Sequence, residues 1–145
     1  GFVAVLDEHR VAFGDLSGNR ILDSLGNIVA DPRVGLLFTV PGLDETLRLN
    51  GRATLTTDPE VLEACRIDGR VPRVAVGVDV EQVYVHCAKA FRRSGLWDPS
   101  SWLDPSERPD VACILRDHLE IDVAPELIAA DLEKGYVATM LELGG

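Results

Sequence analysis

The feature that most constrains the fold is a run at residues 73–86 in which valine recurs at almost every second position. β-Branched residues favour extended backbone, so this run predicts a long strand that crosses the centre of a sheet or barrel. Shorter runs of the same type occur at residues 2–6, 10–13, 34–40 and 45–51, with turn-forming residues between them. The chain is therefore predicted to be rich in mainly antiparallel strands.

Short helices are predicted between and after these strands. Asp23 or Ser24 is the expected N-cap of a helix of about two turns that Pro32 ends, and Asp58 is the expected N-cap of a second helix. Apolar residues at helical spacing predict two further helices at 110–119 and 125–143. We expect one α+β, β-rich domain of residues 1–145, with a small barrel over about 1–97 and a helical tail over about 106–143.

Composition narrows the function classes. A net charge of −10 argues against nucleic-acid and anionic-membrane binding, since both need clustered basic residues. No apolar run approaches the roughly 20 residues of a spanning helix, and no signal peptide is recognisable, so we expect a cytoplasmic protein. Three unevenly spaced cysteines and three isolated histidines predict no metal site. Because the chain opens in mid-strand at Gly1, we also expect that its N-terminus is truncated.

A first candidate site is the turn at residues 15–20, which delivers Asn19 and Arg20 just ahead of the helix that starts near Ser24. Free backbone N–H groups at a helix start attract anions, and a guanidinium can bind phosphate oxygens bidentately. The alternative is that Arg20 makes a surface ion pair, as arginines in acidic proteins often do.

A second candidate is the polar face of the strand at 45–51, formed by Thr46, Arg48 and Asn50, while Leu47 and Leu49 point to the core. These polar side chains could bind the edge of a polar heterocycle. The alternative is an ordinary solvated strand face.

A third candidate is the segment 86–97, in which Lys89, Arg92 and Arg93 reverse the local charge of an acidic chain and Trp97 follows. Basic groups beside aromatic rings suit a flat anionic cofactor. Equally, the basic residues could pair with the chain's many carboxylates.

Nucleophilic catalysis has little support. The Gly-x-Ser-x-Gly, P-loop and Gly-x-Gly-x-x-Gly patterns are absent, and the neighbours His86 and Cys87 would face opposite sides of a strand. Any chemistry is therefore expected from a bound cofactor.

Four segments together resemble the pyridoxamine 5'-phosphate oxidase-like family of FMN-binding split barrels. They are the strand at 2–7, the Gly18-Asn19-Arg20 turn, the run from Asp31-Pro32-Arg33 to Phe38, and residues 45–53. The resemblance covers most of residues 2–57, and residues 86–97 look like the signature of a branch of uncharacterised function. It implies a split β-barrel and a homodimer with FMN at the interface.

The resemblance also assigns residues to the cofactor. It implies that Arg20 and Ser24 hold the phosphate beside Asn19 and Asp23, and that Thr46 and Arg48 make polar contacts to the flavin. Further FMN contacts are expected from two strands and from the basic segment: Val3, Ala4, Val5, Gly14, Asp15, Lys89, Arg92, Ser94 and Trp97.

Departures from the family limit the functional prediction. The basic strand region that family members place upstream of Phe2 is absent, and the helical, acidic tail lacks the substrate-binding pattern of a vitamin B6-producing oxidase. We therefore expect an FMN-dependent oxidoreductase with a small-molecule substrate or nicotinamide donor. The alternatives are a non-catalytic flavin, deazaflavin or haem binding or sensing module, and a plain interaction domain.

Overall fold

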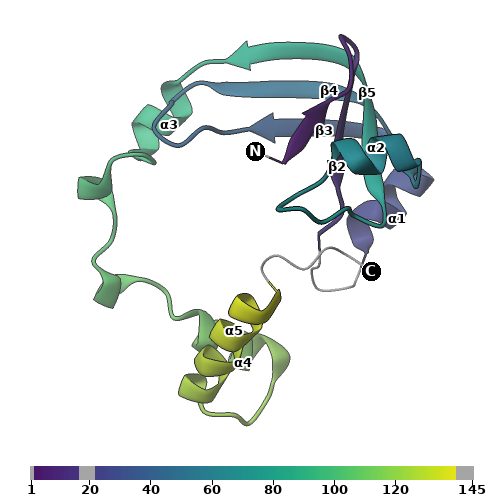
Figure 1. Cartoon of the computed structure of the whole chain (residues 1–145). Helices are drawn as coiled ribbons and strands as arrows, with labels where there is room; N and C mark the ends of the chain where they lie inside the picture. Colours follow the sequence, from purple (N-terminus) through teal and green to yellow (C-terminus); the bar gives the residue numbers. More distant parts are fainter. Residues whose placement is uncertain (1, 17–21, 140–145) are drawn as a thin grey trace.

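A five-stranded antiparallel sheet forms the body of the molecule in the computed structural model, which describes residues 2–16 and 22–139 (Figure 1). Its spatial order is β1-β2-β5-β4-β3. The strands are β1 (Val3–Val5), β2 (Arg10–Gly14), β3 (Arg33–Phe38), β4 (Thr46–Thr56) and β5 (Ala75–His86). The α+β, β-rich class is confirmed, and the sheet is consistent with a split barrel.

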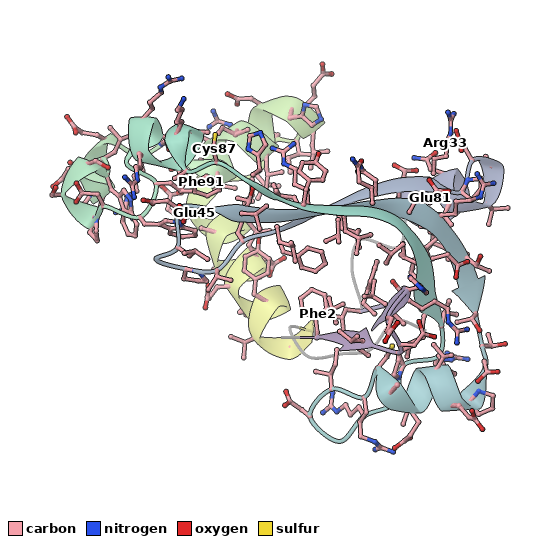
Figure 2. All side chains as sticks on the ribbon, turned by 90° about the horizontal axis from the view of Figure 1, so that it is seen from above. Phe2, Arg33, Glu45, Glu81, Cys87 and Phe91 are labelled. Atoms are coloured by element: carbon pink, nitrogen blue, oxygen red, sulfur yellow. The ribbon has the colours of Figure 1, made fainter. Side chains whose placement is uncertain are left out.

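The long central pair, β4 and β5, carries a bulge where the register shifts between Asn50 and Gly51. Gly51 is required there because a Cβ at this position would collide with the backbone carbonyl oxygen of Asp79. Bulges increase the local twist of a sheet. Figure 2 shows β5 bending, with Phe2 on the inner side of the curl.

The two faces of the curled sheet have separate apolar clusters. On the inner face, Leu49, Ala53, Val76 and Val78 are buried, and helix α1 (Asp23–Ala30) packs its apolar residues against them. On the outer face, helix α2 (Pro59–Ala64) covers a smaller cluster of Ala12, Cys65 and Ala75. The strand alternation in the sequence thus translates into an inner and an outer core.

The C-terminal third leaves the sheet. Helix α3 (Lys89–Ser94) follows β5 directly, and two 3₁₀ turns, η1 (Pro99–Ser101) and η2 (Pro105–Glu107), lie in the connection that follows. Helices α4 (Val111–Leu119) and α5 (Pro125–Thr139) then form a hairpin that lies apart from the sheet (Figure 1). Among the helices in the described part of the chain, none has the length and hydropathy that a membrane crossing needs.

Local expectations are confirmed at several positions and wrong at others. Asp58 caps α2, since its carboxylate accepts hydrogen bonds from the N–H groups of Glu60 (2.9 Å) and Val61 (3.2 Å). The predicted cap of α1 is wrong: Asp23 is already helical, and the residue before it, Leu22, has φ of 62° and no capping side chain. The expected core position of Leu47 is also wrong, because 40% of this residue is exposed.

Candidate functional site

Six polar or aromatic residues share the outer face of the sheet where β4 begins and β5 ends. Directly opposite residues in an antiparallel pair point to the same face, and so do alternate residues along a strand. Thr46 is opposite His86, Arg48 is opposite Tyr84, and Asn50 is opposite Gln82. We call this set the outer polar face: Thr46, Arg48, Asn50, Gln82, Tyr84 and His86.

Two buried polar atoms on this face have no hydrogen-bond partner in the described part of the chain. They are the Thr46 hydroxyl oxygen, in a residue only 3% exposed, and Nε of Arg48. A buried polar group without a partner costs about 1–3 kcal/mol, and native structures rarely leave one unsatisfied. A solvated strand face, the alternative interpretation of the sequence, would not bury these atoms.

Of the other four residues of the outer polar face, two bind each other and two are exposed. The Asn50 side-chain amide donates to Oε1 of Gln82 at 3.0 Å, which fixes the pair that borders Arg48 and Tyr84. Tyr84 is 38% exposed and His86 is exposed, so both side chains remain available to a ligand at the surface. Thr46 and Arg48 therefore lie beside a phenol and an imidazole that the site prediction did not include.

Helix α3 is tied to the start of β4 by aromatic and charged contacts. The rings of Phe91 and Trp97 stack with centroids 5.9 Å apart, and Trp97 Nε1 donates to the carbonyl of Leu43 at 2.9 Å. Arg92 Nε donates to the Asp44 carboxylate, also at 2.9 Å. Figure 2 shows Phe91 and Cys87 near Glu45, the residue directly before β4 begins. These contacts hold the loop that precedes Thr46.

The predicted cofactor residues of segment 86–97 thus differ in availability. Arg92 and Trp97 are engaged with the loop before β4, and the Ser94 hydroxyl donates to the carbonyl of Phe91 at 3.0 Å. The Lys89 side chain has no ion pair or hydrogen bond within residues 2–16 and 22–139. Whether these residues contact a cofactor stays a prediction.

The remaining predicted residues lie elsewhere. Gly14 and Asp15 lie at the end of β2, where a Cβ at Gly14 would come within 2.7 Å of the Pro72 ring, so packing alone explains that glycine. Asp23 and Ser24 form the first turn of α1. Val3, Ala4 and Val5 make up the edge strand β1. Asn19 and Arg20 lie outside the described residues.

These two groups occupy opposite ends of the long strands. Gly14 is in register with Ala75, which is opposite Thr56, whereas Thr46 and His86 mark the other end of the same pair. An 11-residue strand measures about 35 Å. Figure 1 accordingly places α1 at one end of β4 and β5 and α3 at the other. Among the described residues, Gly14, Asp15, Asp23 and Ser24 thus lie toward the other end of the strands from the outer polar face.

The thiols of Cys65 and Cys113 are poorly reactive in their surroundings. Burial raises the pKa of the Cys65 thiol, and burial followed by the neighbouring Asp110 carboxylate raises that of Cys113. The nucleophilic thiolate is therefore disfavoured at both positions. In the described ranges, histidine, cysteine and acidic side chains form no group of three or more that could hold a metal ion.

Tyr84 and His86 could have been found from the sequence. The alternation Gln82, Tyr84, His86 in the last part of the 73–86 run places polar side chains on one face, as in the 45–51 strand. Which residues lie opposite one another depends on the bulge at Asn50 and Gly51, and that register is not written in the local pattern.

Two of the comparisons with known proteins found similar proteins. Residues 1–87 match the family described as "Pyridoxamine 5'-phosphate oxidase". Two solved structures of tagged HupZ from Group A Streptococcus, one of them a histidine-to-alanine variant, are 16% identical to the chain with a TM-score of 0.48. The variant's match covers 59% of this chain and 73% of that one, and the other covers 58% and 68%. No curated protein matches the chain.

Proposed function

The chain belongs to the pyridoxamine 5'-phosphate oxidase family, and from this premise we propose that it is an FMN-binding flavoprotein that acts as an FMN-dependent oxidoreductase. The observation that carries the proposal is the pair of buried, unpartnered polar atoms on β4, the Thr46 hydroxyl and Arg48 Nε. They supply what the polar edge of a flavin ring requires.

The donor set fits that ring edge. The edge alternates carbonyl oxygens with ring nitrogens, so it accepts hydrogen bonds from a guanidinium and exchanges one with a hydroxyl group. When bound, FMN would supply hydride transfer at its N5 atom. Arg48 would orient the ring and offset negative charge on it, and Thr46 would fix its rotation by a directional hydrogen bond. The exposed Tyr84 and His86 would border the space where a small-molecule substrate or nicotinamide donor approaches.

The phosphate end requires a second copy of the chain. Asp23 and Ser24 begin α1, which lies toward the opposite end of β4 from Thr46, so we expect the two ends of one FMN to be held by different copies. A two-fold dimer can place the start of one α1 beside the outer polar face of the partner. We therefore propose a homodimer with FMN at the interface.

The first test is an FMN titration of the purified protein, followed by visible absorption and by quenching of flavin fluorescence. We expect saturable binding and loss of about 10- to 100-fold in affinity for Arg48→Met, because hydrogen bonds from charged groups contribute about 1.5–3 kcal/mol. Arg52→Met is the matched control: Arg52 is an exposed arginine on the same strand and face. Equal affinities in the two variants would remove Arg48 from the site, and the absence of any binding would refute the proposal.

Catalysis is tested separately on the flavin-loaded protein. Anaerobic bleaching of the flavin bands by NADH or NADPH would establish electron transfer from a nicotinamide donor. A loaded protein that no nicotinamide reduces, and that turns over no acceptor, would instead be a binding or sensing module. The exposed His86 on the outer polar face favours haem as the alternative ligand, and a Soret band on haem addition would reveal it.

A further inference from the structure

We propose that the α4–α5 hairpin is an exchanged arm that packs on the sheet of a second copy of this chain, against the uncovered inner face at the ends of β4 and β5. This inference goes beyond flavin binding and concerns how two copies assemble. It shares with the proposed function only the existence of a dimer.

The hairpin is a self-contained unit with unused apolar surface. Its close packing within the described residues is between α4 and α5, and Ala112 is the buried residue of α4. Large apolar side chains nevertheless remain exposed on both helices: Val111 58%, Ile114 54%, Leu127 65% and Val137 73%. Apolar surface gathered on a small unit that is detached from its own core marks a docking surface.

The connection to the hairpin is built to hold it away from its own sheet. Each of its 3₁₀ turns begins at an aspartate whose carboxylate accepts the N–H two residues on, Asp98 from Ser100 (3.0 Å) and Asp104 from Ser106 (2.9 Å). Trp102 Nε1 donates to the carbonyl of Leu96 at 3.1 Å. Three prolines, at 99, 105 and 109, stiffen the same stretch. An ordered spacer fixes the direction of the arm, so the hairpin does not fold back freely.

The receiving surface is the end of the inner face that no element within residues 2–16 and 22–139 covers. Leu47, Val83 and Val85 all point to this face, by their register with Leu49, and they are 40%, 57% and 70% exposed. A β-sheet face this apolar is normally packed against another layer. The ordered spacer carries the hairpin clear of its own sheet (Figure 1), so the hairpin is placed to meet the equivalent surface of a neighbouring copy.

Charge complementarity points to a second copy as the occupant. Residues 110–139 contain seven acidic and two basic side chains, a net charge of −5 with histidine neutral. Helix α3, at the rim of the receiving surface, presents Lys89 and Arg93, which have no ion pair within the described ranges. The acidic arm of one copy is attracted to the basic rim of the other, and this attraction sets the orientation in which the two copies meet.

Two native cysteines allow a direct test of exchange. Cys87 is exposed where β5 ends, and Cys113 is half-buried on α4. Cys87→Ser and Cys113→Ser chains are mixed under mildly dissociating conditions, returned to native buffer and treated with a flexible bis-maleimide. Peptide mass spectrometry then looks for a Cys87–Cys113 link, which in this mixture joins two different chains. As controls, each variant is treated alone, which shows how often two copies of the same cysteine are linked to each other.

We expect the mixed link in the heterodimer and dimeric mass by light scattering. Ile114→Asp and Leu127→Asp together should lower the dimer fraction at least 10-fold, while circular dichroism keeps the native helix and strand signal. The control is Val29→Asp, a 74% exposed valine in the last turn of α1, away from the start of that helix. A monomeric wild-type protein, a link found only within one chain of wild-type protein, or an arm variant that dimerises as well as the control would each overturn the exchange. An arm variant that stays dimeric and binds FMN would overturn it and leave the proposed function intact.

Discussion

Removing the buried hydroxyl of Thr46 should raise the stability of the free protein and lower its affinity for FMN. Thr46→Val replaces the unpartnered hydroxyl with a methyl group of similar size in a residue that is 97% buried. An unsatisfied buried hydroxyl costs about 1–3 kcal/mol, so the variant without FMN should be about 1–2 kcal/mol more stable than wild type. For a chain of this length, that corresponds to a rise in Tm of about 3–8 °C.

The same change should weaken FMN binding. The lost hydrogen bond contributes about 0.5–1.5 kcal/mol net, which is a rise in Kd of about 2- to 13-fold. Ligand stabilisation grows as RT ln(1 + [FMN]/Kd), so a tenfold weaker Kd removes about 1.4 kcal/mol of it in excess FMN. The stability advantage of the variant should therefore shrink or vanish when FMN is added.

The assay is a pair of thermal melts, with and without saturating FMN, on wild type, Thr46→Val and Thr54→Val. Thr54 lies on the same strand and the same face but is exposed, so its variant should match wild type within about 0.5 kcal/mol in both conditions. A Thr46→Val protein that is less stable without FMN, or that keeps its advantage with FMN, would refute the assignment of this hydroxyl to the cofactor.

Three further predictions test the fold. Gly51→Ala should destabilise by more than about 2 kcal/mol in urea unfolding because its Cβ would meet the carbonyl of Asp79, whereas Gly26→Ala, in open space on α1, should stabilise by about 0.5–1 kcal/mol; similar values would contradict the bulge geometry. Asp58→Ala should cost about 1 kcal/mol through the lost cap of α2, and an unchanged melting temperature would count against that cap. The Arg33 guanidinium lowers the pKa of Asp31 from 3.8 to about 2. The stability that this pair contributes is therefore complete above about pH 4 and is lost as the pH falls toward 2. Asp31→Asn should flatten the acid-unfolding curve between pH 4 and pH 2, and an unaltered curve would disprove the pairing.

The sequence predicted those parts of the fold that depend on local chemistry. Apolar and β-branched runs located all five strands, although the run at 45–51 stopped short of the end of β4 at Thr56, and Asp58 located the start of α2. Each of these rests on one residue's conformational preference or on a period of two. The left-handed Leu22 before α1 was not predictable, since leucine has no preference for that conformation.

Relations between distant segments were predicted less well. The side chains opposite Thr46 and Arg48 depend on register across the bulge, and the burial of Thr46 depends on how the sheet curls. The grouping of Arg92 and Trp97 with the cofactor was suggested by local composition and by the family resemblance, and the structure engages both with the loop before β4. A charge reversal in the sequence identifies an unusual surface but does not say what each charge binds.

Dimerisation links the two proposals thermodynamically. If FMN is held by the α1 turn of one copy and the outer polar face of the other, only the dimer binds it tightly, and FMN must in turn stabilise the dimer by the same free energy. Apparent affinity should then rise with protein concentration up to the dimer dissociation constant, and it should fall in an arm variant whose Thr46 and Arg48 are untouched. A chain that binds FMN equally well at all concentrations would hold the whole cofactor by itself, and this result would refute the site shared between two copies.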